Sequence, residues 1–263
     1  MLRLLLTAAT LSLALATPAL AQDSVYIEEL TWTEIRDAIK AGKTTVVLPT
    51  GGTEQNGPHM VMGKHNFIVH HTAGEIAKTL GNALVGPVVA FVPEGNLDPP
   101  SGHMRFPGAI TLPEEYYQKL LEYTARSFKV NGFKDIVMIG DSGGNQKGMG
   151  AVAAMLNTEW AGSGVRVHFI PEYYNSGRFS DYLVKQGYTK EQIGSHAGIT
   201  DTSQLWYVNP KMIRPDKRAN MGGFEGSGVT GDPTKASVEL GKIGIQFKVD
   251  VTIEALKKSM AAK

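Results

Sequence analysis

Apolar and polar positions follow two different periods along the chain, and these periods predict strands and helices in turn. Short runs of consecutive apolar residues are typical of strands buried on both faces, whereas apolar residues spaced three and four apart are typical of helices. We therefore expect strands at residues 44–48, 84–92, 136–139 and 165–170. Helices are expected at residues 66–80, 113–131 and 146–160, with a further helix after Pro233.

Turn and cap residues support these boundaries. Thr31 and Glu34 have the spacing of a capping box, ahead of a helix that ends near Gly42. Repeated strand and helix units predict a mostly parallel sheet covered by helices on both faces, which is a three-layer α/β/α fold. Residues 93–112 form a long loop rich in Pro and Gly, and a loop of this length in a compact domain is usually functional or disordered.

The first 21 residues have the pattern of a cleavable signal peptide. Arg3 precedes an apolar run over residues 4–16, and the stretch ends in Ala-Leu-Ala at residues 19–21. This run is shorter than the roughly 20 apolar residues that a membrane-spanning helix needs. We expect the mature chain, residues 22–263, to be a single α/β domain located in the periplasm or secreted.

Composition narrows the candidate chemistry. The chain contains no cysteine, so a metal ion would have to bind through His, Asp or Glu. The formal net charge is +1 and acidic and basic residues are interspersed, so neither a nucleic acid nor a membrane surface is an expected partner after signal removal. A small-molecule ligand or substrate fits this composition better.

Three polar clusters follow predicted strands or lie in loops. They are residues 54–59 together with His65, residues 141–145, and residues 196–203. In open parallel sheets, binding sites form at the edge where the carboxyl ends of the strands meet. Buried carboxylates and imidazoles gathered there need a partner or a cation, because an isolated buried charge is very costly. A metal ion at this edge would satisfy them together.

These clusters resemble the creatininase (creatinine amidohydrolase) family. Members carry a Glu-Gln-His-Gly-Pro-His stretch after the first strand, an Asp beyond it, an Asn-Gly-His-Gly-Gly-Asn-like loop and a His-Ala-Gly-x-x-Glu-Thr-Ser segment. This chain has a version of each in the same order, and its Phe-Pro-Gly-Ala-Ile at residues 106–110 is similar to the family's Phe-Pro-Gly-Thr-Ile. The likeness covers roughly residues 46–233, and several ordered motifs are much more specific than one.

The resemblance implies a metal centre, but several ligand positions have changed. Asn56 stands where a ligating His is usual, and Ser142 replaces the His of the glycine-rich loop. A closely spaced pair of metal ions is therefore doubtful, and we expect one divalent ion, Zn or Mn, rather than two. The predicted ligands of this rebuilt site are Glu54, His65, Asp141 and Asp201.

The resemblance also suggests roles for other polar residues. His196 keeps the family's His-Ala-Gly position, where an imidazole can pass a proton to a leaving nitrogen, so it is the expected catalytic residue. Its alternative role is to orient the loop. Residues expected to contact substrate are His103, Gly143, Gly144 and Asn145. His103 could instead lie in a subunit contact. The two glycines could instead serve only to permit the turn of the loop.

Two classes of function therefore remain open. The first is a metal-dependent amidohydrolase acting on a non-peptide C–N bond in a cyclic amide, a formamide or a similar small substrate. The second is a non-catalytic small-molecule-binding protein whose metal site has decayed, and the changes at Asn56 and Ser142 favour it. Family resemblance also implies a homo-oligomer.

Overall fold

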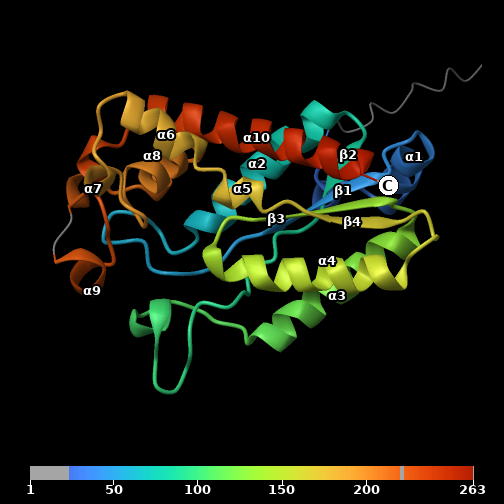
Figure 1. The fold of residues 1–263 in the computed structure, drawn as a ribbon, viewed down its shortest axis with the longest axis horizontal. Helices are drawn as coiled ribbons and strands as arrows, with labels where there is room; N and C mark the ends of the chain where they lie inside the picture. Colours follow the sequence, from blue (N-terminus) through green and yellow to red (C-terminus); the bar gives the residue numbers. More distant parts are fainter. Residues whose placement is uncertain (1–23, 220–221, 263) are drawn as a thin grey trace, which may run out of the picture.

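A four-stranded parallel sheet forms the centre of the protein. The computed structural model describes residues 24–219 and 222–262, so the predicted signal peptide lies outside the described residues and stays a prediction. The sheet order is β2-β1-β3-β4 (Figure 1). The strands are β1 (Thr45–Thr50), β2 (Ala83–Val85), β3 (Asp135–Gly140) and β4 (Arg166–Phe169). Each neighbouring pair is parallel, as the sequence predicts.

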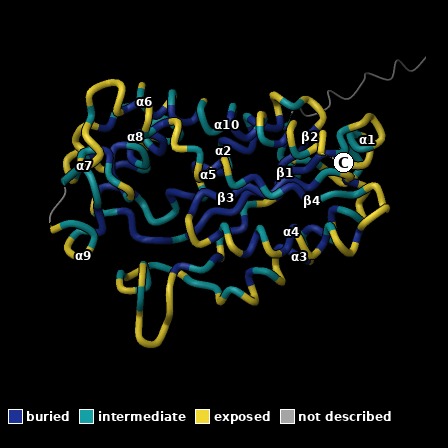
Figure 2. The backbone as a smooth tube through the Cα atoms, viewed as in Figure 1, coloured by how far each residue is buried: buried dark blue, intermediate teal, exposed yellow. Residues whose placement is uncertain are grey.

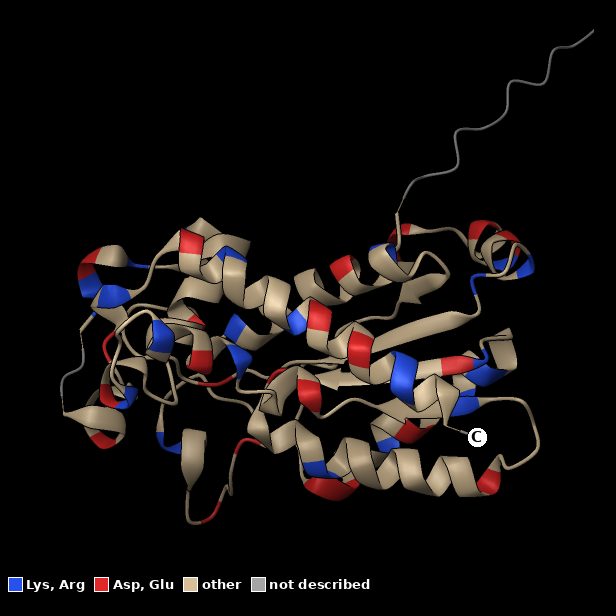
Figure 3. Ribbon diagram, turned by 45° about the horizontal axis from the view of Figure 1, so that its top comes forward, with Lys and Arg blue, Asp and Glu red and all other residues tan. Residues whose placement is uncertain are grey.

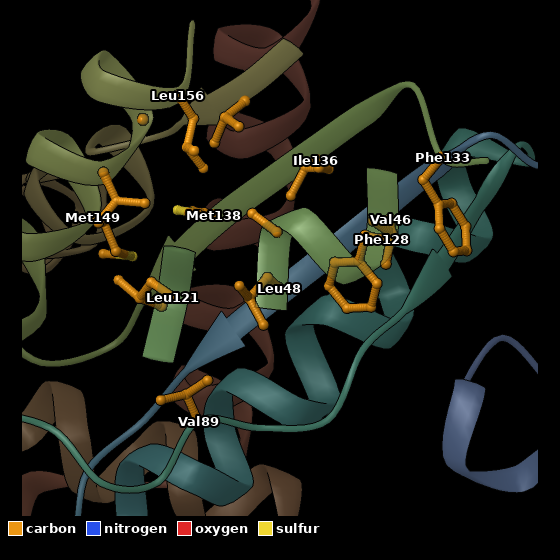
Figure 4. Packing of buried hydrophobic residues seen from close by; sticks show 14 of the residues in the cluster. Val46, Leu48, Val89, Leu121, Phe128, Phe133, Ile136, Met138, Met149 and Leu156 are labelled. Carbon is orange, nitrogen blue, oxygen red and sulfur yellow. The ribbon is translucent and has the colours of Figure 1, made fainter. Parts of the chain in front are cut away.

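Helices cover both faces of this sheet, so the predicted three-layer α/β/α architecture is confirmed (Figure 1). One layer holds α3 (Glu114–Asn131) and α4 (Gln146–Glu159), and the opposite layer holds α2 (Lys64–Leu80) and α10 (Val238–Ala261). Side chains alternate along each strand. Val46 and Leu48 therefore pack in the α3/α4 cluster (Figure 4), whereas Val47 packs in the α2/α10 cluster.

Shorter elements complete the chain. The Thr31 and Glu34 capping box forms as predicted at the start of the first helix. In the described residues the remaining α-helices are α1 (Trp32–Lys40), α5 (Glu172–Asn175), α6 (Arg178–Lys185), α7 (Lys190–Ile193), α8 (Ile199–Val208) and α9 (Gly223–Ser227). The 3₁₀ turns are Ile27–Glu29, Gly102–Arg105, Gly143–Asn145, Pro210–Met212, Pro215–Lys217 and Pro233–Lys235.

The predicted strand at residues 84–92 is too long. Strand β2 ends at Val85, and Gly86 and Pro87 follow it. Pro87 has no N–H to donate to a sheet ladder. The chain returns to the sheet edge only at Val89, which forms an isolated bridge with Thr50. The long loop that follows leaves the body of the molecule beneath α4 (Figure 1).

The buried residues lie in the layers of the fold, and polar residues gather at one end of the sheet. The strands are buried and the loops are mostly exposed or half-buried (Figure 2). Acidic and basic positions are mixed over the ribbon in the view of Figure 3. No helix within residues 24–219 and 222–262 is long and apolar enough to cross a membrane. The polar clusters follow β1 and β3 at their carboxyl ends, and the candidate site forms there.

Candidate functional site

A cavity of about 590 Å³ opens at the carboxyl ends of β1 and β3. Its wall includes Glu54 after β1, the first turn of α2, Asp141 after β3, and His196 before α8. The loop at residues 93–112 contributes His103. Side chains from four distant parts of the sequence therefore meet here, as expected for the edge of a parallel sheet.

Glu54 lies at the centre of this cavity wall and is 1% exposed. Its Oε1 lies 2.8 Å from His65 Nε2 and 2.9 Å from His196 Nε2, while its Oε2 lies 3.1 Å from His103 Nε2. Lys64 Nζ is 3.4 Å from Oε1. Burial alone would raise the pKa of Glu54, but His65, Lys64 and His196 outweigh burial and hold that pKa well below its ordinary value. Glu54 is therefore an ionised carboxylate.

His65 bridges two carboxylates. Its Nε2 faces Glu54 and its Nδ1 lies 2.7 Å from Asp141 Oδ2. Burial and the neighbouring Lys64 oppose a charge on His65, yet Glu54 and Asp141 raise the pKa of His65 to about 9. Both ring nitrogens therefore donate to carboxylate oxygens. In this arrangement His65 has no lone pair for a metal ion, which argues against the ligand role expected from the sequence.

The other two predicted ligands also have partners from the protein. Asp141 Oδ1 accepts from Lys248 Nζ at 2.9 Å and from the Tyr173 hydroxyl at 3.1 Å. Asp201 Oδ2 accepts from Lys64 Nζ and from the Ala197 backbone N–H, both at 2.9 Å. Burial would raise the pKa of each aspartate, but the lysine beside it lowers that pKa. The predicted ligands are thus close together but do not form one ligand shell.

His196 has a defined orientation. Its Nδ1 lies 2.8 Å from the Gly228 carbonyl oxygen, which can only accept, so Nδ1 carries a proton. Its Nε2 faces the Glu54 carboxylate, and two acceptors cannot hydrogen-bond without a proton or a cation between them. Histidine ligands of metals characteristically donate their other N–H to a carbonyl or carboxylate in this way. His196 is thus oriented either to carry a proton or to bind a metal ion.

Glu54, His103 and His196 form a candidate metal centre. One ligand atom from each lies within 4.8 Å of the others, and no other such group was found among the residues that the structure describes. Phe224 contacts both imidazole rings edge-on, with centroid distances of 5.5 Å. Burial lowers the pKa of His103 to about 4, so its ring is neutral. One carboxylate and two imidazoles suit zinc, and no thiolate is required.

This centre fits a metal ion with one rearrangement at His103. The Gln55 amide nitrogen lies 3.4 Å from His103 Nδ1, and Gln55 Oε1 accepts from the Gly57 N–H, so Nδ1 acts as the acceptor and Nε2 carries the proton. Metal binding through Nε2 requires that proton to leave. The 3.4 Å contact is long for a hydrogen bond, so it is the contact that would give way.

The predicted substrate contacts divide into two groups. His103, Gly143 and Gly144 line the cavity, whereas Asn145 is fully buried outside its lining. Asn145 Nδ2 donates to Thr50 Oγ1 at 2.7 Å and to a backbone carbonyl of the β1 turn at 2.8 Å. These contacts favour a structural role for Asn145, and its contact with substrate stays a prediction.

Sequence reasoning missed three charged or acidic residues of the cavity wall, which are Lys64, Lys248 and Glu94. Burial and the nearby Glu54 raise the pKa of Glu94 to about 9, so Glu94 is a neutral acid at pH 7. Its Oε1 is buried without a hydrogen-bond partner among the described residues. Glu94 follows the apolar run at residues 84–92, and this position could have identified it. Lys64 directly precedes His65 in the chain, but a lysine at that position does not by itself predict burial.

The fold and this carboxylate–histidine cavity define a three-layer α/β protein with a candidate metal centre. A model of the creatininase family, described as creatinine amidohydrolase, matches residues 28–256. The chain therefore belongs to the creatininase family, whose characterised relatives are hydrolases.

Curated relatives differ in their named substrates. The chain is 26% identical over 219 residues to a mycofactocin precursor peptide peptidase of Mycolicibacterium smegmatis, covering 75% of this chain and 78% of the relative. It is 24% identical over 199 residues to creatinine amidohydrolase of Pseudomonas putida, covering 74% and 75%. Both names describe hydrolases, but one specifies a peptide and the other creatinine.

Solved structures confirm the fold. A mutant creatininase superimposes with a TM-score of 0.75 at 21% identity, over 90% of this chain and 98% of the other. A structure described as creatininase with Mn gives a TM-score of 0.73 at 22% identity over the same shares. A mutant described as the Zn-Zn type gives 0.70 at 21% identity, over 90% and 99%. These identities establish shared architecture and leave the chemistry of this chain to its own residues.

Proposed function

We propose that this creatininase-family hydrolase is a metal-dependent amidohydrolase that cleaves a non-peptide C–N bond, in a cyclic amide, a formamide or a similar small substrate. The observation that carries the proposal is the convergence of Glu54, His103 and His196 in the cavity wall, with ligand atoms within 4.8 Å of one another. The family's hydrolase relatives and the Mn and Zn forms of solved creatininases support it.

The protein's own groups suit this reaction. A divalent ion held by Glu54, His103 and His196 would supply a Lewis acid for the amide carbonyl and lower the pKa of water. A departing nitrogen needs a proton, and two groups of the wall are placed to deliver one. Glu94 keeps a proton at pH 7. His196 donates its Nδ1–H to a backbone carbonyl, so it could deliver a proton only from Nε2 and only where Nε2 does not bind the ion.

Cavity size favours a second substrate class for the same chemistry. A volume of about 590 Å³ lies in the range of roughly 300–1,000 Å³ that is typical of sites for drug-sized ligands. A small lactam would leave much of this space to water. Short peptides are therefore the second candidate substrates, and the peptidase relative carries the same suggestion.

Metal-reconstituted protein would be assayed against cyclic amides, formamides and short peptides, with His196→Ala as the test variant. A proton-carrying role predicts that kcat falls by about 10²- to 10⁴-fold while bound metal stays constant. A ligand role predicts that metal is lost as well. His70→Ala is the matched control, because His70 stacks on Tyr26 outside the cavity lining. Folded protein that binds neither Zn nor Mn and hydrolyses none of these compounds would favour the non-catalytic binding protein.

A further inference from the structure

Lys64 is a buried lysine at the first turn of α2. Its side chain is 1% exposed, and its Nζ lies 2.9 Å from Asp201 Oδ2 and 3.4 Å from Glu54 Oε1. Lysine is almost never fully buried unless it is paired, because the ammonium group loses its hydration. Lys64 also begins a helix, where the helix dipole disfavours positive charge. The two carboxylates, rather than helix formation, therefore hold it there.

Each of the two lysines of the cavity wall pairs with a different aspartate. Asp201 pairs with Lys64, and on the far side of His65 the Asp141 carboxylate pairs with Lys248 at 2.9 Å. Glu54 is the only one of these three carboxylates that also faces His103 and His196. Protein cations thus already occupy the positions beside two of the acids. Space for a metal ion, and a carboxylate to bind it, remain on the side of Glu54 that faces His103 and His196.

We propose that the Lys64 ammonium is a built-in cation that takes the place of a second metal ion, so that the centre binds one divalent ion and one lysine. A solved relative at a TM-score of 0.70 is described as a Zn-Zn form. In this chain Asn56 does not line the cavity, and its Nδ2 is used by backbone carbonyls, the shortest contact being 2.9 Å. The inference rests on the proposed metal site at Glu54, and it adds the number of ions and the residue that limits it.

Removing the ammonium should expose this limit. The Lys64→Met variant keeps the length and apolar stem of the side chain but removes the ammonium group that lies between Glu54 and Asp201. Carboxylates and water suit Mn²⁺, so a second ion should enter. The probe is therefore Mn²⁺ alone, added to full-length metal-stripped protein and measured by isothermal titration and by elemental analysis after gel filtration.

Wild type should bind one Mn²⁺ per chain and Lys64→Met should bind two. Lys78→Met is the matched control, because Lys78 lies on the same helix, pairs with Glu75 at 3.0 Å and is exposed. It should bind one ion, like wild type. The double variant Lys64→Met/Asp201→Asn should also return to one, since it lacks both the ammonium and the carboxylate that would attract the second ion. A structural salt bridge would affect stability without changing this stoichiometry.

Two ions bound to wild type, or one ion bound to both wild type and folded Lys64→Met, would overturn the inference. If Lys64→Met does not fold, the same Mn²⁺ measurement is made on Lys64→Gln, whose amide can still hydrogen-bond to one carboxylate. No ion on wild type but one on the Lys64 variant would remove the proposed Glu54, His103 and His196 metal site while supporting Lys64 as the cation of the centre. No ion on either protein would defeat both proposals.

Discussion

The charged His65 predicts that the metal-free protein loses stability at mildly alkaline pH. Its pKa rises from 6.5 to about 9 on folding. The folded state therefore holds a proton that the unfolded chain releases, so the stabilisation is complete below pH 6.5 and is lost as the pH rises through 9. A difference of 2.5 pKa units corresponds to about 3 kcal/mol of unfolding free energy. For a chain of this size that is roughly 6–12 °C in Tm.

Urea unfolding between pH 6 and 9.5, in the presence of a chelator, would measure this loss. Glu94 releases its proton in the same range, so the comparison is made in a Glu94→Gln background. His59 and His103 have pKa values lowered from 6.5 to about 4 on folding, so the unfolded chain binds their protons near pH 6.5; this contribution is the same in both proteins and cancels from the comparison. Adding His65→Asn should flatten the pH dependence by about 3 kcal/mol. If both proteins lose the same stability over this range, the paired imidazolium is not present in solution.

Three further changes test the cavity wall and the buried residue beside it by chemical denaturation. Glu94→Gln should raise the free energy of unfolding at pH 8 by about 1 kcal/mol or more. The folded state keeps the Glu94 proton up to about pH 9, whereas the unfolded chain loses it above pH 4.5, so the native Glu94 destabilises the fold between these values. An unchanged free energy of unfolding would mean that Glu94 is ionised. Asn145→Ala should cost about 2–3 kcal/mol by removing two buried hydrogen bonds, one of them to Thr50, and a cost near zero would contradict its structural role. Gly144→Ala should destabilise the protein by about 1–3 kcal/mol, because the new Cβ would lie 2.2 Å from the Pro93 carbonyl oxygen, and a neutral result would show that the loop can move.

The sequence predicted those elements whose apolar pattern is long and regular. The strands at residues 44–48 and 136–139 and the helices that flank them agree with the structure to within a few residues, because the core requires their periodicity. The sequence pattern does not predict the separate helices of residues 172–208. Two of them, α5 and α7, have four residues each, too short for an apolar period to show. Their ends depend on local caps such as the Thr189 and Gln192 pair.

The sequence predicted where the site residues lie better than it predicted their protonation states. Parallel-strand geometry and the family motifs correctly place Glu54, His65, Asp141 and His196 around one cavity. They do not reveal that His65 uses both nitrogens on carboxylates, because that depends on two acceptors brought from distant segments. Asn145 shows the same limit, since its two partners lie at the end of a different strand, β1.

Buried charges have to be balanced as a set, and this explains why Lys64 and Lys248 are difficult to recognise one at a time. Each looks like an ordinary helix lysine in the sequence, and each gains significance only beside Asp201 or Asp141. When ligand positions such as Asn56 and Ser142 change, the remaining acids still need positive charge. A lysine on a neighbouring helix can provide it without a metal ion. Changed ligand positions in a buried centre are therefore best interpreted together with every nearby lysine, because those lysines supply positive charge that the remaining carboxylates need.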